Sequence, residues 1–181
     1  MRILRASQHK RMPWKNGAGV TTEIAIAPVG SAIDTFDWRI SMAKVPDSGP
    51  FSSFAGIDRV LAVLDGAMDL QVGDDEPVRL GSRSPAAEFA GDIPTRADVI
   101  DPVTDLNVMV RRGRFVACVT RLGERNVTAG ATETLLLLRS VAELEAGEAL
   151  GIDDVVHLSR GEKLNFVRVP DHAWLIEIEA R

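Results

Sequence analysis

The sequence is poor in the residues that hold metals or form disulfides. It contains a single cysteine, Cys118, which has no partner for an internal disulfide and stands in an apolar run where we expect it to be buried. The three histidines, His9, His157 and His172, are far apart and form no His-x-His pair. Because transition metals are usually held by clustered histidine and cysteine side chains, we expect no metal and no cofactor.

Positive charge and long apolar runs are also scarce. The net charge is −5 and there is no long basic run, so we do not expect binding to nucleic acid. No segment approaches the ~20 consecutive apolar residues of a membrane span, and no apolar segment follows the basic residues near the N-terminus. We therefore expect no membrane association and a soluble, cytoplasmic protein.

Short apolar or alternating runs rich in Val, Ile, Leu and Phe recur along the chain, and Gly, Pro, Asp and Ser separate them. This pattern predicts a mostly β protein, because helical periodicity is interrupted in nearly every longer window. The expected strands are Thr21–Ala27, Trp38–Val45, Val60–Leu64, Met68–Val72, Pro77–Leu80, Ala86–Phe89, Ala97–Ile100, Leu106–Val110, Phe115–Arg121, Thr134–Arg139, Val155–Leu158, Lys163–Val167 and Trp174–Glu179.

Local signals add further expectations to this strand pattern. Asp65-Gly66 predicts a hairpin turn, since this pair suits the positive φ angles of a type I′ turn. One helical turn is expected in each of Asp101–Asn107 and Ser140–Glu145. So many short strands predict a closed barrel or sandwich, in two β units that meet near Leu122: residues 1–122, which carry the motifs, and residues 123–181.

The most distinctive stretch runs from Met12 to Ile24 with the sequence MPWKNGAGVTTEI. It predicts a loop that leads into a strand. Trp14, Lys15 and Asn16 offer a stacking surface, a positive charge and directional hydrogen bonds, and Gly17 and Gly19 leave room for a ligand close to the backbone. The alternative is a tight structural turn with Trp14 in the core.

Two predicted strands carry an unusual number of polar residues on one face. Alternation in WRISMA places Trp38, Ile40 and Met42 on one face and Arg39, Ser41 and Ala43 on the other. Of the adjacent pair, we expect Arg39 rather than Trp38 to point inward. In the later strand, Asp105, Asn107, Met109 and Arg111 share a face, which is either a satisfied structural network or a binding surface.

These motifs resemble the HutD/Ves family. The resemblance rests on MPWKNGAGVTTEI, on WRIS from Trp38, on GPFSSF and GIDR between Gly49 and Arg59, on FAGD from Phe89, and on DLNVM and RR from Asp105. It covers about the first two thirds of the chain. The sequence departs from the usual family pattern at Ala18, Thr22 and Ala90, which bears on ligand identity more than on fold.

The resemblance implies a cupin-type β-barrel, with two cupin units in one chain (a bicupin). It also implies a link to histidine utilisation and binding of a small acidic intermediate such as formylglutamate or formiminoglutamate, in a regulatory role. A cupin without clustered histidines is not suited to metal-dependent oxygen chemistry, so binding is expected rather than redox catalysis.

Three functional hypotheses follow. The first is a metal-free protein that binds a small carboxylate metabolite, with Lys15 and the arginines as carboxylate partners. The second is a non-metal cupin isomerase or hydrolase acting on a small carboxylic acid, with Glu23, Asp92 or Asp105 as general base. The third is that the loop of Trp14 to Gly19 is an interface and the chain forms a homodimer. The expected ligand-binding residues are Trp14, Lys15, Asn16, Arg39, Phe51, Arg59, Asp92, Asn107 and Arg111.

Overall fold

The computed structural model describes residues 1–14 and 19–181, and the chain divides into two compact units. Unit 1 combines Met1–His9 with Ala117–Arg181, and unit 2 is Lys10–Val116. Apart from a short 3-10 turn at Ala6–Gln8, all regular elements of the described residues are β-strands. The prediction of an all-β protein is therefore confirmed. The described residues contain no helix long and apolar enough to cross a membrane.

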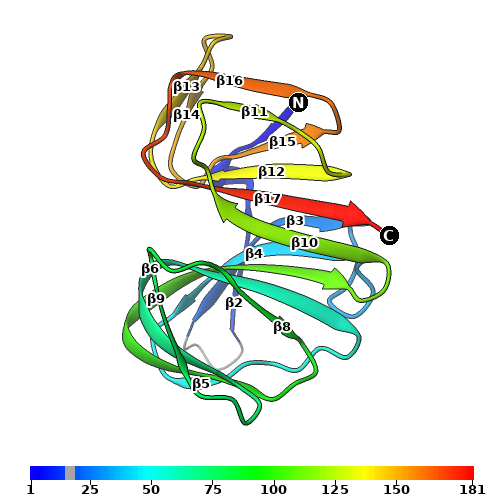
Figure 1. Ribbon diagram of the computed structural model, residues 1–181, viewed down its shortest axis with the longest axis vertical. Helices are drawn as coiled ribbons and strands as arrows, with labels where there is room; N and C mark the ends of the chain where they lie inside the picture. Colours follow the sequence, from blue (N-terminus) through cyan, green and yellow to red (C-terminus); the bar gives the residue numbers. More distant parts are fainter. Residues whose placement is uncertain (15–18) are drawn as a thin grey trace. The chain divides into compact units, whose positions relative to one another are not determined.

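Unit 2 is built on one antiparallel sheet with the strand order β2-β3-β4-β9-β6-β7; β5 pairs with β9, and β8 pairs with β6. Figure 1 shows β6 and β9 as long curved strands that curl around an interior shared with their neighbours. The hydrogen bonds among the described residues do not close this sheet, so a closed barrel stays a prediction. The strands are β2 Lys10–Pro13, β3 Val20–Ala27, β4 Trp38–Val45, β5 Gly49–Pro50, β6 Ile57–Val72, β7 Val78–Gly81, β8 Ala87–Ala90 and β9 Thr95–Arg111.

The predicted hairpin at Asp65-Gly66 is wrong, because both residues lie inside the continuous strand β6. Here β6 bulges against β9, with register shifts between Val63 and Met68. Gly66 has φ +81°, and a Cβ atom added to it would lie 2.2 Å from the carbonyl oxygen of Pro102 on β9. The Asp-Gly signal thus marks a bend where two backbones approach closely, and not the end of a strand.

The two predicted helical turns are also wrong. Asp101–Asn107 lies within β9, which continues through the expected break to give a strand of 17 residues. The segment Ser140–Glu145 contains strand β13. In both places the neighbouring strands supply the hydrogen bonds, β4 and β6 for β9, and β14 and β16 for β13. Pairing between distant segments therefore outweighs the weak local helical signal.

Unit 1 contains a five-stranded sheet with the order β1-β15-β12-β17-β10 and a four-stranded sheet with the order β11-β16-β13-β14. Its core includes Leu136, Leu138, Val156, Leu158 and Phe166, all fully buried. The strands are β1 Arg2–Leu4, β10 Phe115–Arg121, β11 Asn126–Thr128, β12 Glu133–Leu138, β13 Ala142–Leu144, β14 Ala149–Leu150, β15 Val155–Ser159, β16 Lys163–Arg168 and β17 Ala173–Ala180.

The expectation of a buried Cys118 is wrong, since its side chain is exposed. Cys118 lies on β10, at an edge of the five-stranded sheet, and alternation along the strand buries its neighbour Val119 instead. An apolar run on an edge strand can thus leave one face open to solvent.

We predict that Gly66→Ala destabilises the protein by more than about 3 kcal/mol, because it combines a positive φ angle with a backbone overlap. The matched control is Gly56→Ala, where φ is +68° and an added Cβ would meet nothing within 4 Å. This control should cost only about 1–2 kcal/mol, from the φ angle alone. Urea unfolding followed by fluorescence gives both values, and equal losses would contradict the close approach at Gly66.

Candidate ligand-binding site

The strand register of unit 2 gathers polar side chains on one face of the sheet. Met109 on β9 pairs with Arg39 on β4 and, on its other side, with Arg59 on β6. Asn107 on β9 pairs with Ser41 on β4. Residues directly opposite one another share a face of the sheet. We call this face, which also carries Asp105, the inner face. Of these residues, Arg39, Ser41, Arg59, Asp105 and Met109 are buried, and Asn107 is half-buried.

Strand β3 adds a carboxylate to this face, next to a β-bulge. Glu23 on β3 pairs with Ser41, but Ala25 pairs with Ile40, so one residue is inserted between them. The insertion shifts the register and allows both Glu23 and Ile26 to point to the same side as Arg39. We call Glu23, Arg39, Ser41, Arg59, Asp105 and Asn107 the buried polar cluster.

Arg39 is neutralised within the cluster. Its Nε donates a hydrogen bond of 2.8 Å to Oε2 of Glu23, and both side chains are largely withdrawn from water. The expectation that Arg39 lies on the polar face and Trp38 on the other agrees with the strand register, although Trp38 is equally buried. A buried ion pair of this kind leaves little net charge for a ligand.

Arg59 has a different environment, made mainly of aromatic rings. Its guanidinium carbon lies 4.8 Å from the ring centre of Phe51, 5.2 Å from that of Phe89 and 5.9 Å from that of Phe54. Its Nε donates a long hydrogen bond of 3.4 Å to Oδ1 of Asn107, and Nη1 donates to the carbonyl of Ser52 at 3.3 Å. Burial lowers the pKa of Arg59 to about 10, so the group remains a cation at neutral pH.

No carboxylate of the described residues forms an ion pair with Arg59, although the side chain is only 4% exposed. Burying an isolated charge is costly, and such a charge is normally paired. The rings and the two weak acceptors offset part of this cost. Arg59 is therefore a buried cation with capacity left for an anion.

Asp105 is the second unusual charge of the cluster. It is 2% exposed, and its Oδ1 accepts a hydrogen bond of 3.2 Å from the backbone N–H of Ala43. Burial raises the pKa of Asp105 to about 7, and the positive charge of Arg59 and the Ala43 hydrogen bond only partly oppose this shift. Asp105 can thus gain or lose a proton near neutral pH.

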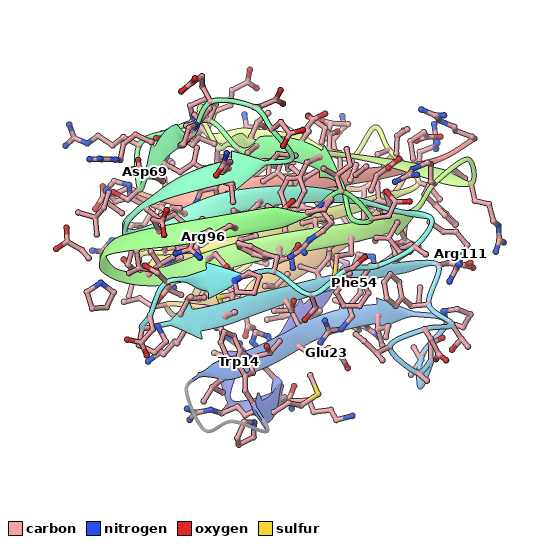
Figure 2. The ribbon with its side chains drawn as sticks, turned by 90° about the horizontal axis from the view of Figure 1, so that it is seen from below. Trp14, Glu23, Phe54, Asp69, Arg96 and Arg111 are labelled. Atoms are coloured by element: carbon pink, nitrogen blue, oxygen red, sulfur yellow. The ribbon has the colours of Figure 1, made fainter. Side chains whose placement is uncertain are left out.

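Two expected ligand-binding residues lie apart from the cluster. Arg111 donates hydrogen bonds to the carbonyl of Phe36, from Nε at 3.1 Å and from Nη2 at 2.7 Å. These bonds hold the segment between β3 and β4 in place. Asp92 is exposed and accepts two hydrogen bonds from Arg112, which lowers its pKa to about 2. Figure 2 shows Arg111 at one end of unit 2 and Asp69 at the opposite end, with Glu23 and Phe54 between them.

The opening motif is described only in part. Lys15 and Asn16, together with Gly17 and Ala18, lie outside the described residues. Trp14 is half-buried, and its indole N–H donates a hydrogen bond of 2.8 Å to Oγ1 of Thr21 on β3. A Cβ atom at Gly19 would lie 2.8 Å from the Trp14 ring and 2.6 Å from the carbonyl of Lys44, so Gly19 makes room for protein atoms.

The sequence placed Arg39, Phe51, Arg59 and Asn107 among the ligand-binding residues, and Glu23 and Asp105 among the alternative bases, and the structure brings these six to one region. It adds Ser41, Phe54 and Phe89, which were not singled out as site residues. Phe89 contacts Arg59 because the two pair across β8 and β6, and this register cannot be read from one sequence. Phe54 belongs to the motif GPFSSF, and this motif could have been used to predict an aromatic side chain near the site.

The described residues contain no group of three or more His, Cys, Asp or Glu side chains placed to hold a metal ion. The cluster instead offers two guanidinium groups, two carboxyl groups, one amide and one hydroxyl. This combination can bind an organic acid by charge and hydrogen bonds.

Antiparallel strands that curl around a buried polar cluster place the protein among those with a cupin-like fold. The Cupin 2 conserved barrel domain protein from Leptotrichia buccalis superimposes with a TM-score of 0.57 at 9% identity, over 95% of this chain and 96% of that chain. At this identity the likeness concerns the fold alone.

The chain belongs to the HutD family, whose model matches residues 6–175. The uncharacterised 21.2 kDa protein in the hutC 3′ region of Pseudomonas putida is 30% identical over 188 residues, covering 100% of this chain and 98% of that protein. Protein Ves of Cronobacter sakazakii is 36% identical over 126 residues, 67% of each chain. HutD from Pseudomonas fluorescens SBW25, described with a formate condition, has a TM-score of 0.83 at 29% identity over 99% of this chain and 98% of that chain. The predicted HutD/Ves resemblance is confirmed, and this family is linked to the histidine-utilisation locus.

We predict that Asp105→Asn changes the pH dependence of stability with a definite sign. The folded pKa of about 7 lies above the unfolded value of 3.8, so Asp105 binds a proton on folding between these pH values. Its contribution to stability is complete below about pH 4 and is lost as pH rises through 7. The asparagine variant keeps the acceptor for Ala43. Its free energy of unfolding relative to that of the wild type should therefore increase by about 2–4 kcal/mol between pH 4 and pH 8.

Urea unfolding of both proteins from pH 4 to pH 8.5 measures this difference. Other ionisable groups act equally in the two proteins and cancel. A difference that stays constant over this range would contradict a raised pKa at Asp105.

Proposed function

We propose that this protein binds a small acidic metabolite at the buried polar cluster of unit 2 and has a regulatory role in histidine utilisation. The ligand class is an acid that resembles formylglutamate or formiminoglutamate. The protein acts here as a metal-free binding protein, and the carboxylate of the ligand is its main anchoring group.

The observation that carries this proposal is the unpaired charge of Arg59. A guanidinium presents a planar fork of donors that matches a carboxylate, and its charge-assisted hydrogen bonds are stronger when water is excluded. The rings of Phe51, Phe54 and Phe89 exclude water around it. Arg39 is less suited to this role because Glu23 already neutralises it.

Partial exposure within the cluster supports access by a ligand. Phe51 and Phe54 are half-buried, and so are Glu23 and Asn107, although Arg59 and Asp105 between them are buried. A ligand that reaches Arg59 therefore passes aromatic surface and meets an amide and an ion pair. These neutral or paired groups suit the polar N-acyl part of such a metabolite, which is uncharged in formylglutamate.

We predict that Arg59→Gln weakens binding of N-formyl-L-glutamate by at least about 30-fold, which corresponds to about 2 kcal/mol, because the variant lacks the buried charge. The matched control is Arg96→Gln, since Arg96 on β9 is exposed and pairs with Asp98. Isothermal titration calorimetry at pH 6.5 gives the affinities, and thermal melting checks the fold of each variant.

The control should bind like the wild type. Equal affinities for the wild type and a folded Arg59→Gln protein would exclude Arg59 as the anchor. If formylglutamate, formiminoglutamate and urocanate all give no heat at millimolar concentration, the ligand class itself is wrong.

A second candidate function is an isomerase or hydrolase acting on a small carboxylic acid. The buried carboxyl group of Asp105 favours it, because a pKa of about 7 suits a general base near neutral pH. Among the three carboxylates expected for this role, Asp92 is exposed and Glu23 is paired with Arg39, which leaves Asp105. Proton NMR of formylglutamate during long incubation tests this function: turnover that disappears in Asp105→Asn would establish catalysis, and unchanged substrate would exclude it.

We further propose that unit 1 and unit 2 are each a cupin unit, so that the chain is a bicupin. Both units consist of antiparallel strands in the described residues, and the cupin-like neighbour from Leptotrichia buccalis aligns with 95% of the chain. The buried polar cluster is confined to unit 2, which makes unit 2 the ligand-binding unit.

A further inference from the structure

Arg59 and Asp105 carry opposite charges on the same inner face and are both buried, yet they form no ion pair with each other. Arg59 lies opposite Met109, and its side chain reaches along β9 to Asn107. Asn107 and Asp105 are two residues apart on the same strand, so their side chains are neighbours on the inner face. The guanidinium and the carboxyl group are thus close enough to interact electrostatically, and Asn107 stands between them in the register of β9.

The two carboxyl oxygens of Asp105 differ in their hydrogen bonds. Its Oδ1 accepts the hydrogen bond from Ala43, and its Oδ2 has no hydrogen-bond partner among the described residues. A ligand group placed beside Asn107 could therefore form a hydrogen bond with Oδ2.

We propose that a ligand carboxylate binds between Arg59 and the protonated form of Asp105, so that binding takes up one proton from solution. This inference rests on the proposed binding function and adds the partner of Arg59 and the protonation state of the complex. The ligand carboxylate accepts charge-assisted hydrogen bonds from Arg59 and one hydrogen bond from the carboxyl O–H of Asp105.

The proton follows from the charges at the site. Two carboxylates that share one site repel each other, so a bound carboxylate favours the neutral form of Asp105. Among the described residues, Arg59 on β6 acts on Asp105 electrostatically, and Arg39 on β4 and Glu23 on β3 share its face of the sheet, while Lys10 on β2, which pairs with Glu23, is exposed. Arg39 and Glu23 compensate each other, so with Asp105 neutral the cluster presents one net positive charge to one ligand carboxylate.

No histidine occurs between residues 10 and 156, so unit 2 has no histidine that could cause a pH dependence near neutrality. Asp105, whose pKa is raised to about 7 in the free protein, is the group of the cluster suited to titrate there. Linkage then requires the affinity to be constant well below pH 7 and to fall by about tenfold per pH unit well above it.

Calorimetry of the full chain with N-formyl-L-glutamate tests this inference. At each pH from 5.5 to 8.5 the titration is run in two buffers with different ionisation enthalpies, such as phosphate and Tris at pH 7.5 and above. The difference in observed heat gives the number of protons taken up. The expected uptake rises from near zero at pH 5.5 to about one at pH 8.5, and the affinity falls over the upper part of this range.

Two variants distinguish a proton on Asp105 from one elsewhere. Asp105→Asn keeps a hydrogen-bond donor but cannot ionise, so its folded protein should bind with an affinity independent of pH and with no proton uptake. Asp98→Asn is the matched control, since Asp98 lies on the same strand, is exposed and pairs with Arg96. It should retain the pH dependence of the wild type.

Heat of binding without proton uptake at pH 8.5 would overturn this inference and leave the binding function standing, whereas no heat at any pH would remove both. Infrared spectroscopy of the wild type provides a measurement that needs no variant. At pH 8.5 the band of a protonated carboxyl group should grow when ligand is added, and its absence in a protein shown to bind would also overturn the inference.

Discussion

The pairing of β6 with β9 is the interaction on which the rest of unit 2 depends. These two long strands pair from Ile57 with Arg111 to Val72 with Thr95, and each also pairs with further strands of the unit. Their register sets Arg59 beside Met109 and Asn107, and it places Asp105 two residues further along the same face. Because side chains alternate between the two faces of a sheet, a shift of one residue would turn all of these groups to the opposite side. The bend at Gly66 lets the strands remain paired while they curve.

The buried polar cluster combines a neutral pair with two charges that are left apart. The Glu23–Arg39 ion pair resembles a structural interaction, since each group offsets the cost of burying the other. Arg59 and Asp105 compensate each other only in part, and burial lowers the pKa of Arg59 to about 10 and raises that of Asp105 to about 7. Groups perturbed in this way are often found at functional sites. The free-energy cost of burying each group without a partner is recovered when a ligand pairs with it. The proposed binding and the proposed proton uptake therefore depend on the same arrangement.

Much of the strand content could be predicted from local patterns, and the errors have a common origin. The strand Trp38–Val45 was placed with its observed ends, because its alternation is strong and turn residues flank it. The hairpin at Asp65-Gly66 and the turn at Asp101–Asn107 were wrong because both lie where the paired strands β6 and β9 bulge, and the bulges there need the residues that usually end strands. The site follows the same rule: Arg59 and Asn107 could be named from their motifs, but their contact depends on the register of two segments almost fifty residues apart.

The all-β class, the family and most of the polar residues of the cluster could be inferred from sequence patterns, because alternation, turn chemistry and motif identity are local properties of the chain. Tertiary structure alone decided which of these residues meet. It turned Asp92 to an exposed pair with Arg112, used Arg111 to hold a loop, and left Arg59 buried among three phenylalanine rings. The physical reason is that burial and electrostatic environment are set by strand register and by packing between distant segments. The pKa of an aspartate is therefore lowered to about 2 at Asp92, beside Arg112, and raised to about 7 by burial at Asp105.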